Sequence, residues 1–313
     1  MKTYTYTLKR GISPSKAFQK KKLASFAVNV GTKCGHSCLY CSTGTMLRMH
    51  ESFKACGESP FEQGYAIVDP SSPDRVALDA KRILKRGLIQ LCTTVDAWSP
   101  EAQQYQLGYR CLKAILTEHN WTIRVLTKNA NVEHDFSYIK QHRNRVLVGL
   151  SITAPPDKTE IIEILEPHAS GIAERMSVLR TASSMGLRTY AMFCPLLPAI
   201  SDAPQQIDEL VRFAVECNAE EIFVEPVNQR GPGLRLCQET LELRGYDEPA
   251  QAIRSIRTGN GWSHYVVELL KNTQRSVRKY SEISRLRFLL YPKRLTAQDL
   301  VAVSHDPEGI IWL

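Results

Sequence analysis

Long apolar runs and internal repeats are absent from the sequence. None of its 313 residues belongs to an apolar run near the roughly 20 residues that span a bilayer. Residues 1–10 are polar and contain no apolar signal core, which argues against export. With 43% hydrophobic and 23% charged residues, the composition is ordinary for a globular protein. We therefore expect a cytoplasmic protein with no membrane partner.

Disulfides are not expected, although the chain has nine cysteines. In a chain without an export signal, cysteines point to metal binding or catalysis in a reducing compartment. Three of them, Cys34, Cys38 and Cys41, are closely spaced. The others are Cys56, Cys92, Cys111, Cys194, Cys217 and Cys237, and they form no second three- or four-cysteine set.

Acidic residues are fewer than basic ones, 32 against 40, and the net charge of +8 favours a polyanionic partner such as nucleic acid. Residues 1–25 are basic and irregular, so we interpret them as an arm that is either solvated or in contact with phosphates. Lys271, Arg275, Arg278 and Lys279 continue one basic helix face near the other end. Such a face is either solvated or flanks a nucleic-acid groove.

Strand and helix patterns alternate from residue 26 onward. The predicted strands are 26–30, 88–92, 122–127, 145–153, 187–194 and 221–225, and the intervening helices include 74–87, 101–117, 134–142, 172–186 and 207–214. Six strands alternating with helices predict a parallel sheet with right-handed crossovers, arranged as a partial (β/α)6 barrel. Residues 46–73 show no periodicity and are interpreted as a long loop or insertion. The resulting division is an arm at 1–25, an α/β core at 26–230 and a mainly helical basic extension at 231–313, whose residues 309–313 form a last strand or dock on the barrel.

The loop after the first predicted strand reads Cys34-Gly-His-Ser-Cys-Leu-Tyr-Cys41, with CxxxCxxC spacing. Three thiolates on one loop can bind three irons of a [4Fe–4S] cube, leaving the fourth iron for a small molecule. A structural zinc site would need a fourth ligand, for which His36 and Cys56 are the candidates, and no second CxxC is present. Inert buried cysteines are the third interpretation.

This cysteine loop resembles that of the radical S-adenosylmethionine (SAM) enzymes. The resemblance implies a [4Fe–4S] cluster held by Cys34, Cys38 and Cys41, with SAM on the open iron. It also implies a low-potential electron donor of the flavodoxin or ferredoxin type as a partner. Because no second cysteine set exists, an auxiliary cluster is not expected.

Polar residues follow several predicted strands and are candidates for cofactor contacts. A lysine at a strand end, Lys128, could pair with the methionine carboxylate of SAM. The hydroxyls of Ser151 and Thr153 could bind the ribose, and Asn129 could contact either group. Polar residues at strand ends also cap helices and solvate loops, so both interpretations stay open.

The order of motifs is similar to that of the spore photoproduct lyase group of radical SAM proteins, over residues 25–230. The similarity is carried by the cysteine loop, Cys92-Thr-Thr-Val-Asp96, Val125-Leu-Thr-Lys-Asn-Ala-Asn-Val-Glu-His134, Glu166-Pro167 with Arg175, and Glu225-Pro-Val-Asn-Gln-Arg230. It implies that Lys128 binds the SAM carboxylate, that Ser151 contacts the cofactor, and that the backbone of Thr93 or Thr94 takes the place of a missing Gly-Gly-Glu motif.

The same resemblance implies two catalytic residues. Cys92 matches the cysteine that returns a hydrogen atom to the product radical, although a buried strand cysteine is the plainer interpretation. Tyr40 matches the first of two tyrosines in the radical-return route, but Ser42 stands where the second would be. The expected function is a radical SAM enzyme of the lyase type that acts on a nucleic-acid base such as a thymine photoproduct. The alternatives are a radical SAM enzyme with a protein or metabolite substrate, and a zinc-stabilised nucleic-acid-binding module without catalysis.

Overall fold

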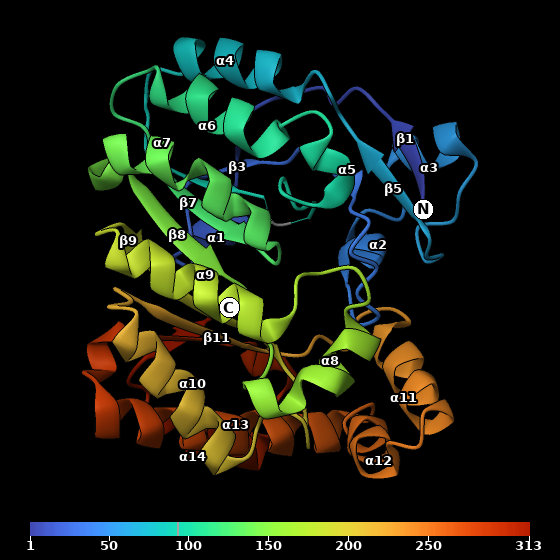
Figure 1. The fold of residues 1–313 in the computed structure, drawn as a ribbon. Helices are drawn as coiled ribbons and strands as arrows, with labels where there is room; N and C mark the ends of the chain where they lie inside the picture. The colour runs from blue at the N-terminus through green and yellow to red at the C-terminus, as the bar shows by residue number, and fades with distance from the viewer. Residues whose placement is uncertain (93) are drawn as a thin grey trace.

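A curved parallel sheet organises the chain, and the computed structural model describes residues 1–92 and 94–313 (Figure 1). Four strands pair in parallel in the order β3 (Phe26–Val28), β6 (Leu88–Leu91), β7 (Thr122–Thr127) and β8 (Val146–Leu150). At one edge, β2 (Ser13–Pro14) pairs antiparallel with β3, and at the other β9 (Arg188–Thr189) pairs parallel with β8. Parallel strands joined by helical crossovers are the pattern that the sequence predicts.

The sheet continues through one bridge between Ser151 and Met192. Beyond it lie four more parallel strands, β10 (Ala191–Leu196), β11 (Ile222–Pro226), β12 (Leu286–Leu290) and β13 (Ile310–Trp312). Among the described residues no strand pairing joins β13 to β2 or β3, so the barrel is open. The predicted α/β fold with a partial parallel barrel is confirmed, as is a last strand near the end of the chain. The division at residues 25 and 230 stays a prediction, although the sheet extends past both.

Helices cover the outer face of the sheet. They include α4 (Ser72–Arg82), α6 (Leu107–Leu116), α7 (Phe136–Gln141), α9 (Ile172–Ser184), α10 (Pro204–Glu216), α13 (Gly259–Tyr280) and α14 (Ala297–Ser304). Successive strand residues point to opposite faces, and Ile123 and Val125 of β7 accordingly join the large core beneath the helices. The smaller group α8 (Thr159–Leu165), α11 (Gly233–Leu243) and α12 (Asp247–Ser255) lies together at the lower right of Figure 1.

A second apolar cluster lies on the inner face of the sheet. Strand residues such as Leu147, Phe223 and Leu289 pack there with Leu23 from the N-terminal segment. The segment that includes α1 (Lys16–Lys20) therefore closes part of the barrel interior, rather than extending as a free arm.

Residues 46–73 contain helices and a strand, so their interpretation as a long loop is wrong. They contain the end of α2 (Thr43–Met46), then α3 (Glu51–Cys56) and β5 (Tyr65–Val68). The fully buried β5 pairs with β1 (Lys2–Thr5) in parallel and with β4 (Gly31–Lys33) antiparallel. Residues 1–25 are likewise not irregular, since they contain β1, β2 and α1. The sequence pattern does not reveal β1, because this strand pairs with β5, about 60 residues away in the sequence.

Several predicted elements have different bounds. The helix predicted at 101–117 is two helices, α5 (Pro100–Gln103) and α6, because Gln106 between them has a φ of 51°. The strand predicted at 187–194 is divided into β9 and β10, which pair with different neighbours. Part of the helix predicted at 134–142 is a 3-10 turn, Ala130–Asp135. In the described part of the chain, no helix has both the length and the apolar character needed to cross a membrane.

Candidate functional site

The carboxyl ends of four neighbouring parallel strands meet at one edge of the sheet and bring predicted site residues together. Thr94 after β6 lies beside Asn29 after β3, and the Thr94 amide donates to Asn29 Oδ1 at 3.1 Å. Lys128 after β7 lies beside Ser151 after β8, and Lys128 Nζ donates to Ser151 Oγ at 2.8 Å. Thr93, predicted to contact the SAM amino group, lies outside the described residues.

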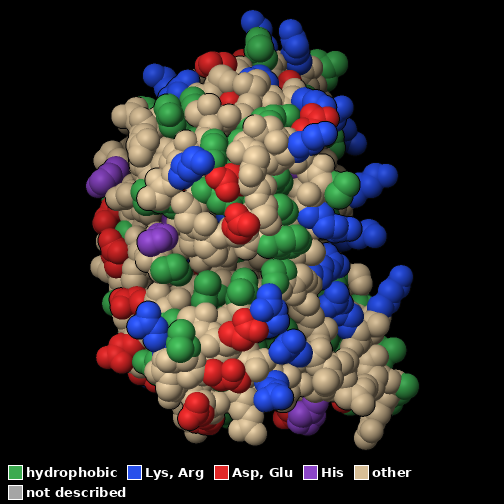
Figure 2. All heavy atoms as spheres, turned by 90° about the vertical axis from the view of Figure 1, so that its right-hand side faces the viewer, with side chains coloured by type: hydrophobic (Ala, Val, Ile, Leu, Met, Phe, Trp, Pro, Cys, Tyr) green, Lys and Arg blue, Asp and Glu red, His purple; other side chains and the backbone are tan. Residues whose placement is uncertain are grey.

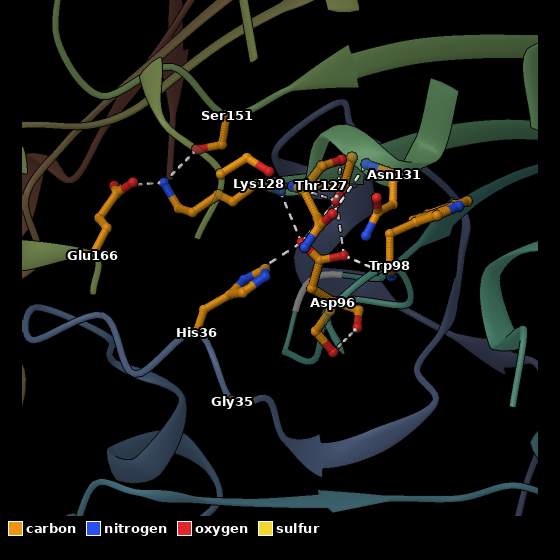
Figure 3. Close-up of polar contacts among 12 residues, drawn as sticks. Gly35, His36, Asp96, Trp98, Thr127, Lys128, Asn131, Ser151 and Glu166 are labelled. Carbon is orange, nitrogen blue, oxygen red and sulfur yellow. Dashed lines mark hydrogen bonds and ion pairs between the residues drawn. The ribbon is translucent and has the colours of Figure 1, made fainter. Parts of the chain in front are cut away.

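Asp96 connects this edge to the cysteine loop (Figure 3). Its carboxylate accepts hydrogen bonds from Thr127 Oγ1 and from the Lys128 amide, each at 2.8 Å. His36 Nδ1 lies 3.7 Å from the same carboxylate, and burial lowers the pKa of His36. Asp96 thus fixes the position of Lys128 relative to the loop that carries the cysteines.

Glu166 is the centre of the site. One carboxylate oxygen, Oε1, accepts from Lys128 Nζ at 3.0 Å, from Thr153 Oγ1 at 2.7 Å and from the Tyr40 hydroxyl. The other oxygen accepts from Arg175 Nη2 at 2.6 Å. Burial alone would raise the pKa of Glu166, but Arg175 and Lys128 hold it at about 2. Glu166 is therefore ionised at every physiological pH.

The two cations of this group differ in exposure. Arg175 and Glu166 are both 1% exposed, whereas Lys128 remains 15% exposed. Glu166 and the nearby Asp96 carboxylate balance the two cations, so the partly exposed Lys128 ammonium, and not a net charge of the group, is what an anionic ligand such as a carboxylate would pair with. Lys128 Nζ also donates to the Cys194 carbonyl at 3.3 Å, its longest hydrogen bond and the easiest to exchange for a ligand.

The three clustered cysteines differ in exposure but share one electrostatic environment. Cys38 is buried, Cys34 is half-buried and Cys41 is exposed. Burial, with Cys41 as the next cause, raises the pKa of the Cys34 thiol to about 12. Burial also raises the pKa of Cys38 well above its ordinary value, with contributions from Glu166, Cys41 and Cys34 and an opposing one from Lys128. Outside position 93, no group of three His, Cys, Asp or Glu side chains is arranged to hold one metal ion.

In and behind the cysteine loop lie buried polar atoms that have no hydrogen-bond partner among the described residues. They are His36 Nε2 and Ser37 Oγ of the loop and Glu101 Oε2 of α5. Glu101 accepts the Gly35 amide hydrogen through its other oxygen at 2.6 Å and so supports the loop from behind. Unpartnered buried polar atoms are costly, and in this loop they suit a polar group placed among the thiols. The loop therefore fits a bound cluster and cofactor.

The two predicted catalytic residues lie in different surroundings. Tyr40 is at the centre, where burial and Glu166 raise its pKa well above the ordinary value. Cys92 is 1% exposed, has a φ of 64° and packs in the large apolar cluster, not in the inner-face cluster. Burial, followed by Asp96 and Cys111, raises the pKa of the Cys92 thiol, which is therefore protonated.

Another strand-end cysteine, Cys194, does lie with the inner-face cluster. Its thiol is 3.6 Å from Glu225 Oε2 and its carbonyl accepts from Ser151 Oγ at 2.5 Å. Glu225 in turn pairs with Lys21 at 2.7 Å. No pattern in the sequence distinguishes Cys194, since the direction of its side chain depends on how β10 joins the sheet.

The remaining predicted residues play local structural roles as well. Asn129 Oδ1 accepts from the Asn131 amide at 3.0 Å and caps the following 3-10 turn, the alternative that the sequence left open. Arg175, which the sequence pattern links only to the Glu166-Pro167 motif, is the partner of Glu166. It stands on the otherwise apolar face of α9, and a buried arginine in such a position predicts a buried carboxylate partner.

Comparison with known proteins gives relatives of low identity, and no family model matches the chain. An uncharacterized protein, ORF301 of Acidianus two-tailed virus, is 21% identical over 223 residues, which are 69% of this chain and 71% of that protein. An uncharacterized protein of Methanocaldococcus jannaschii is 24% identical over 61% of this chain and 67% of its own length. An uncharacterized protein of Mycobacterium tuberculosis is 21% identical over 66% of this chain and 59% of its own length.

Solved structures give the clearer similarity. Spore photoproduct lyase complexed with dinucleoside spore photoproduct has a TM-score of 0.56 at 15% identity, covering 89% of this chain and 79% of the lyase. A mutant lyase with bound AdoMet and dinucleoside spore photoproduct has a TM-score of 0.58 at 14% identity, with the same coverage. At these identities the likeness concerns the fold alone. The chain has the α/β fold of spore photoproduct lyase.

Proposed function

We propose that this protein is a radical SAM enzyme. One observation carries the proposal: Tyr40, between Cys38 and Cys41 in the cysteine loop, donates its hydroxyl hydrogen to Glu166 Oε1, the same oxygen that accepts from Lys128 Nζ at 3.0 Å. This shared contact supports the assignment of the predicted cluster ligands and the predicted carboxylate-binding lysine to one site. The radical SAM-like fold supports the same conclusion.

The residues of the site have separate roles in this proposal. Cys34, Cys38 and Cys41 would bind three irons as thiolates. Lys128 would pair with the methionine carboxylate, held in place by Glu166 and by Asp96 through its backbone amide. A [4Fe–4S] cluster with SAM supplies a 5′-deoxyadenosyl radical for hydrogen abstraction when bound, given an electron from a flavodoxin- or ferredoxin-type donor.

For the substrate we propose a nucleic-acid base, with a thymine photoproduct as the specific candidate. Lys and Arg side chains gather along the right-hand edge of the face in Figure 2, while acidic side chains lie mostly in its centre and left part. In the N-terminal segment, Arg10, Lys16, Lys20 and Lys22 are exposed and have no ion-pair partner among the described residues. Such a surface favours phosphate backbones.

Two observations favour the alternative, a protein or metabolite substrate in the same enzyme class. Ser42 replaces the second tyrosine of the radical-return route. The predicted hydrogen donor Cys92 packs in the large apolar cluster, not in the inner-face cluster. Repair activity is tested by incubating the reduced, anaerobically reconstituted protein with SAM and ultraviolet-damaged DNA. Restored thymine would support the lyase, and slow SAM cleavage that is indifferent to DNA would support the alternative.

Metal analysis tests the proposal against the zinc-stabilised binding module. We expect about four irons with acid-labile sulfide per chain, whereas the module would hold about one zinc. Alanine substitution of Cys38 should abolish the cluster. Alanine substitution of Cys237, a buried cysteine of α11 outside the Cys34–Cys41 loop, is the matched control and should retain the cluster. A single zinc and no sulfide in the wild-type protein would refute the proposal.

A further inference from the structure

A pocket of about 330 Å³ opens beside the candidate site. Asn29 and Thr94, at the carboxyl ends of two parallel strands, form one wall. An N-terminal wall is formed by Leu8, Lys9, Arg10, Gly11 and Ser13, and His50 at the start of α3 lines the pocket as well. Its size is in the range of about 300–1,000 Å³ that is usual for sites of small ligands.

The N-terminal wall is held rigidly. The Leu8 amide donates to Asp69 Oδ2 at 2.7 Å, and the Gly11 amide donates to Asp79 Oδ2 at 2.9 Å. Gly11 packs so closely on α4 that an added Cβ would lie 2.3 Å from the Val76 nitrogen. The two residues between these anchors are therefore fixed at the pocket instead of moving with a free end.

Those two residues are cationic. Lys9 pairs with Glu51 at 3.4 Å, and both side chains are largely exposed. The Arg10 guanidinium has no hydrogen-bond or ion-pair partner within residues 1–92 and 94–313. No described residue that lines the pocket is acidic. The pocket is therefore positively charged, with one arginine available for a ligand.

The other polar groups that line the pocket are able to donate hydrogen bonds. His50 Nδ1 accepts the Ser52 amide hydrogen at 3.2 Å, so in the neutral ring Nε2 carries the proton. The hydroxyls of Ser13 and Thr94 are additional donors. A pocket lined by a guanidinium together with hydroxyl and imidazole donors suits a phosphate, which has several acceptor oxygens.

We propose that this pocket binds a phosphate group of the substrate, with Arg10 as its principal contact. Phosphate binding follows from the pocket alone, whereas its assignment to the substrate rests on the proposed function. The pocket adjoins the strand ends that carry the candidate site, so a phosphate bound there would position the rest of a substrate towards Lys128 and the cysteine loop. The phosphate could belong to a nucleic-acid strand or to a small phosphorylated molecule.

Phosphate binding by Arg10→Gln and Arg82→Gln variants of the reconstituted full-length protein tests this proposal. Arg82, at the end of α4, is exposed, has no ion-pair partner among the described residues and does not line the pocket. Both substitutions remove one positive charge. Calorimetric titration with inorganic phosphate, without SAM or reductant, should show affinity about tenfold weaker in Arg10→Gln, or about 1.4 kcal/mol. Arg82→Gln should bind as the wild type does.

Fluorescence anisotropy with a labelled single-stranded oligonucleotide distinguishes the two phosphate sources. A loss confined to Arg10→Gln with this probe assigns the pocket to a strand phosphate. An unchanged oligonucleotide affinity, with weakened inorganic phosphate binding, assigns it to a small phosphorylated molecule. Absence of phosphate binding, or equal losses in both variants, would overturn the proposal. Because no SAM cleavage enters these measurements, their outcome is separate from that of the proposed radical chemistry.

Discussion

Replacing Glu166 with glutamine should destabilise the protein strongly, since one carboxylate holds the site together. It accepts hydrogen bonds from Lys128, Thr153, Tyr40 and Arg175. Glutamine keeps the shape of the side chain but removes its charge. Arg175, itself 1% exposed, would then be a buried cation without a counter-charge.

Two estimates of the effect agree. Removing one partner of a buried ion pair costs about 3–5 kcal/mol of the free energy of unfolding. The pKa of Glu166 falls from an ordinary 4.5 to about 2 in the folded protein, which corresponds to about 3 kcal/mol. Because the pKa is depressed, this contribution is complete above pH 4.5 and is lost as the pH falls towards 2.

Urea denaturation followed by circular dichroism measures the effect, with Glu163→Gln as the control. Glu163 is exposed on the nearby helix α8. We expect Glu166→Gln to lower the free energy of unfolding by about 3 kcal/mol at pH 7, and by the same amount at pH 6 and pH 8. Equal stabilities of the two variants, or a difference that changes between pH 6 and 8, would refute the central role of Glu166.

Three further changes test other parts of the structure. Lys128→Ala should weaken SAM binding about tenfold or more while iron and sulfide contents stay at wild-type levels; an unchanged SAM affinity would contradict its role. If Cys92 is the hydrogen donor, Cys92→Ala should leave SAM cleavage intact and give aberrant products. Mass spectrometry of the products, with Cys194→Ala measured in parallel, shows which of the two thiols alters the product. Gly11→Ala should lower the free energy of unfolding by about 1–3 kcal/mol, because its Cβ would overlap the Val76 backbone. Gly259→Ala, whose Cβ meets nothing within 4 Å, is the control, and equal stabilities would contradict the close packing at Gly11.

The regular part of the fold was predictable from the sequence. The strand Thr122–Thr127 has the predicted bounds, because its apolar run stands between clear helix signals. The small sheet of β1, β4 and β5 was missed. Its strands are only three or four residues long and pair with distant partners, and such pairing leaves no periodic signal in one segment.

The site was predictable to a similar extent. Parallel topology was enough to place Lys128 beside Ser151, because both follow neighbouring strands. The central role of Glu166 was not predictable, since it depends on where the chain after α8 crosses the sheet edge. The left-handed backbone conformation of Cys92, which affects the direction of its side chain, was not predictable either.

The central claim is that the Cys34–Cys41 loop and the Lys128 site together cleave SAM. Production of 5′-deoxyadenosine by the reduced, anaerobically reconstituted protein tests it most directly, with Cys38→Ala as the negative control and Cys237→Ala as the positive one. We expect 5′-deoxyadenosine from the wild type and from Cys237→Ala, and none from Cys38→Ala. Absence of 5′-deoxyadenosine from a wild-type protein that holds a full complement of iron and sulfide would contradict the account.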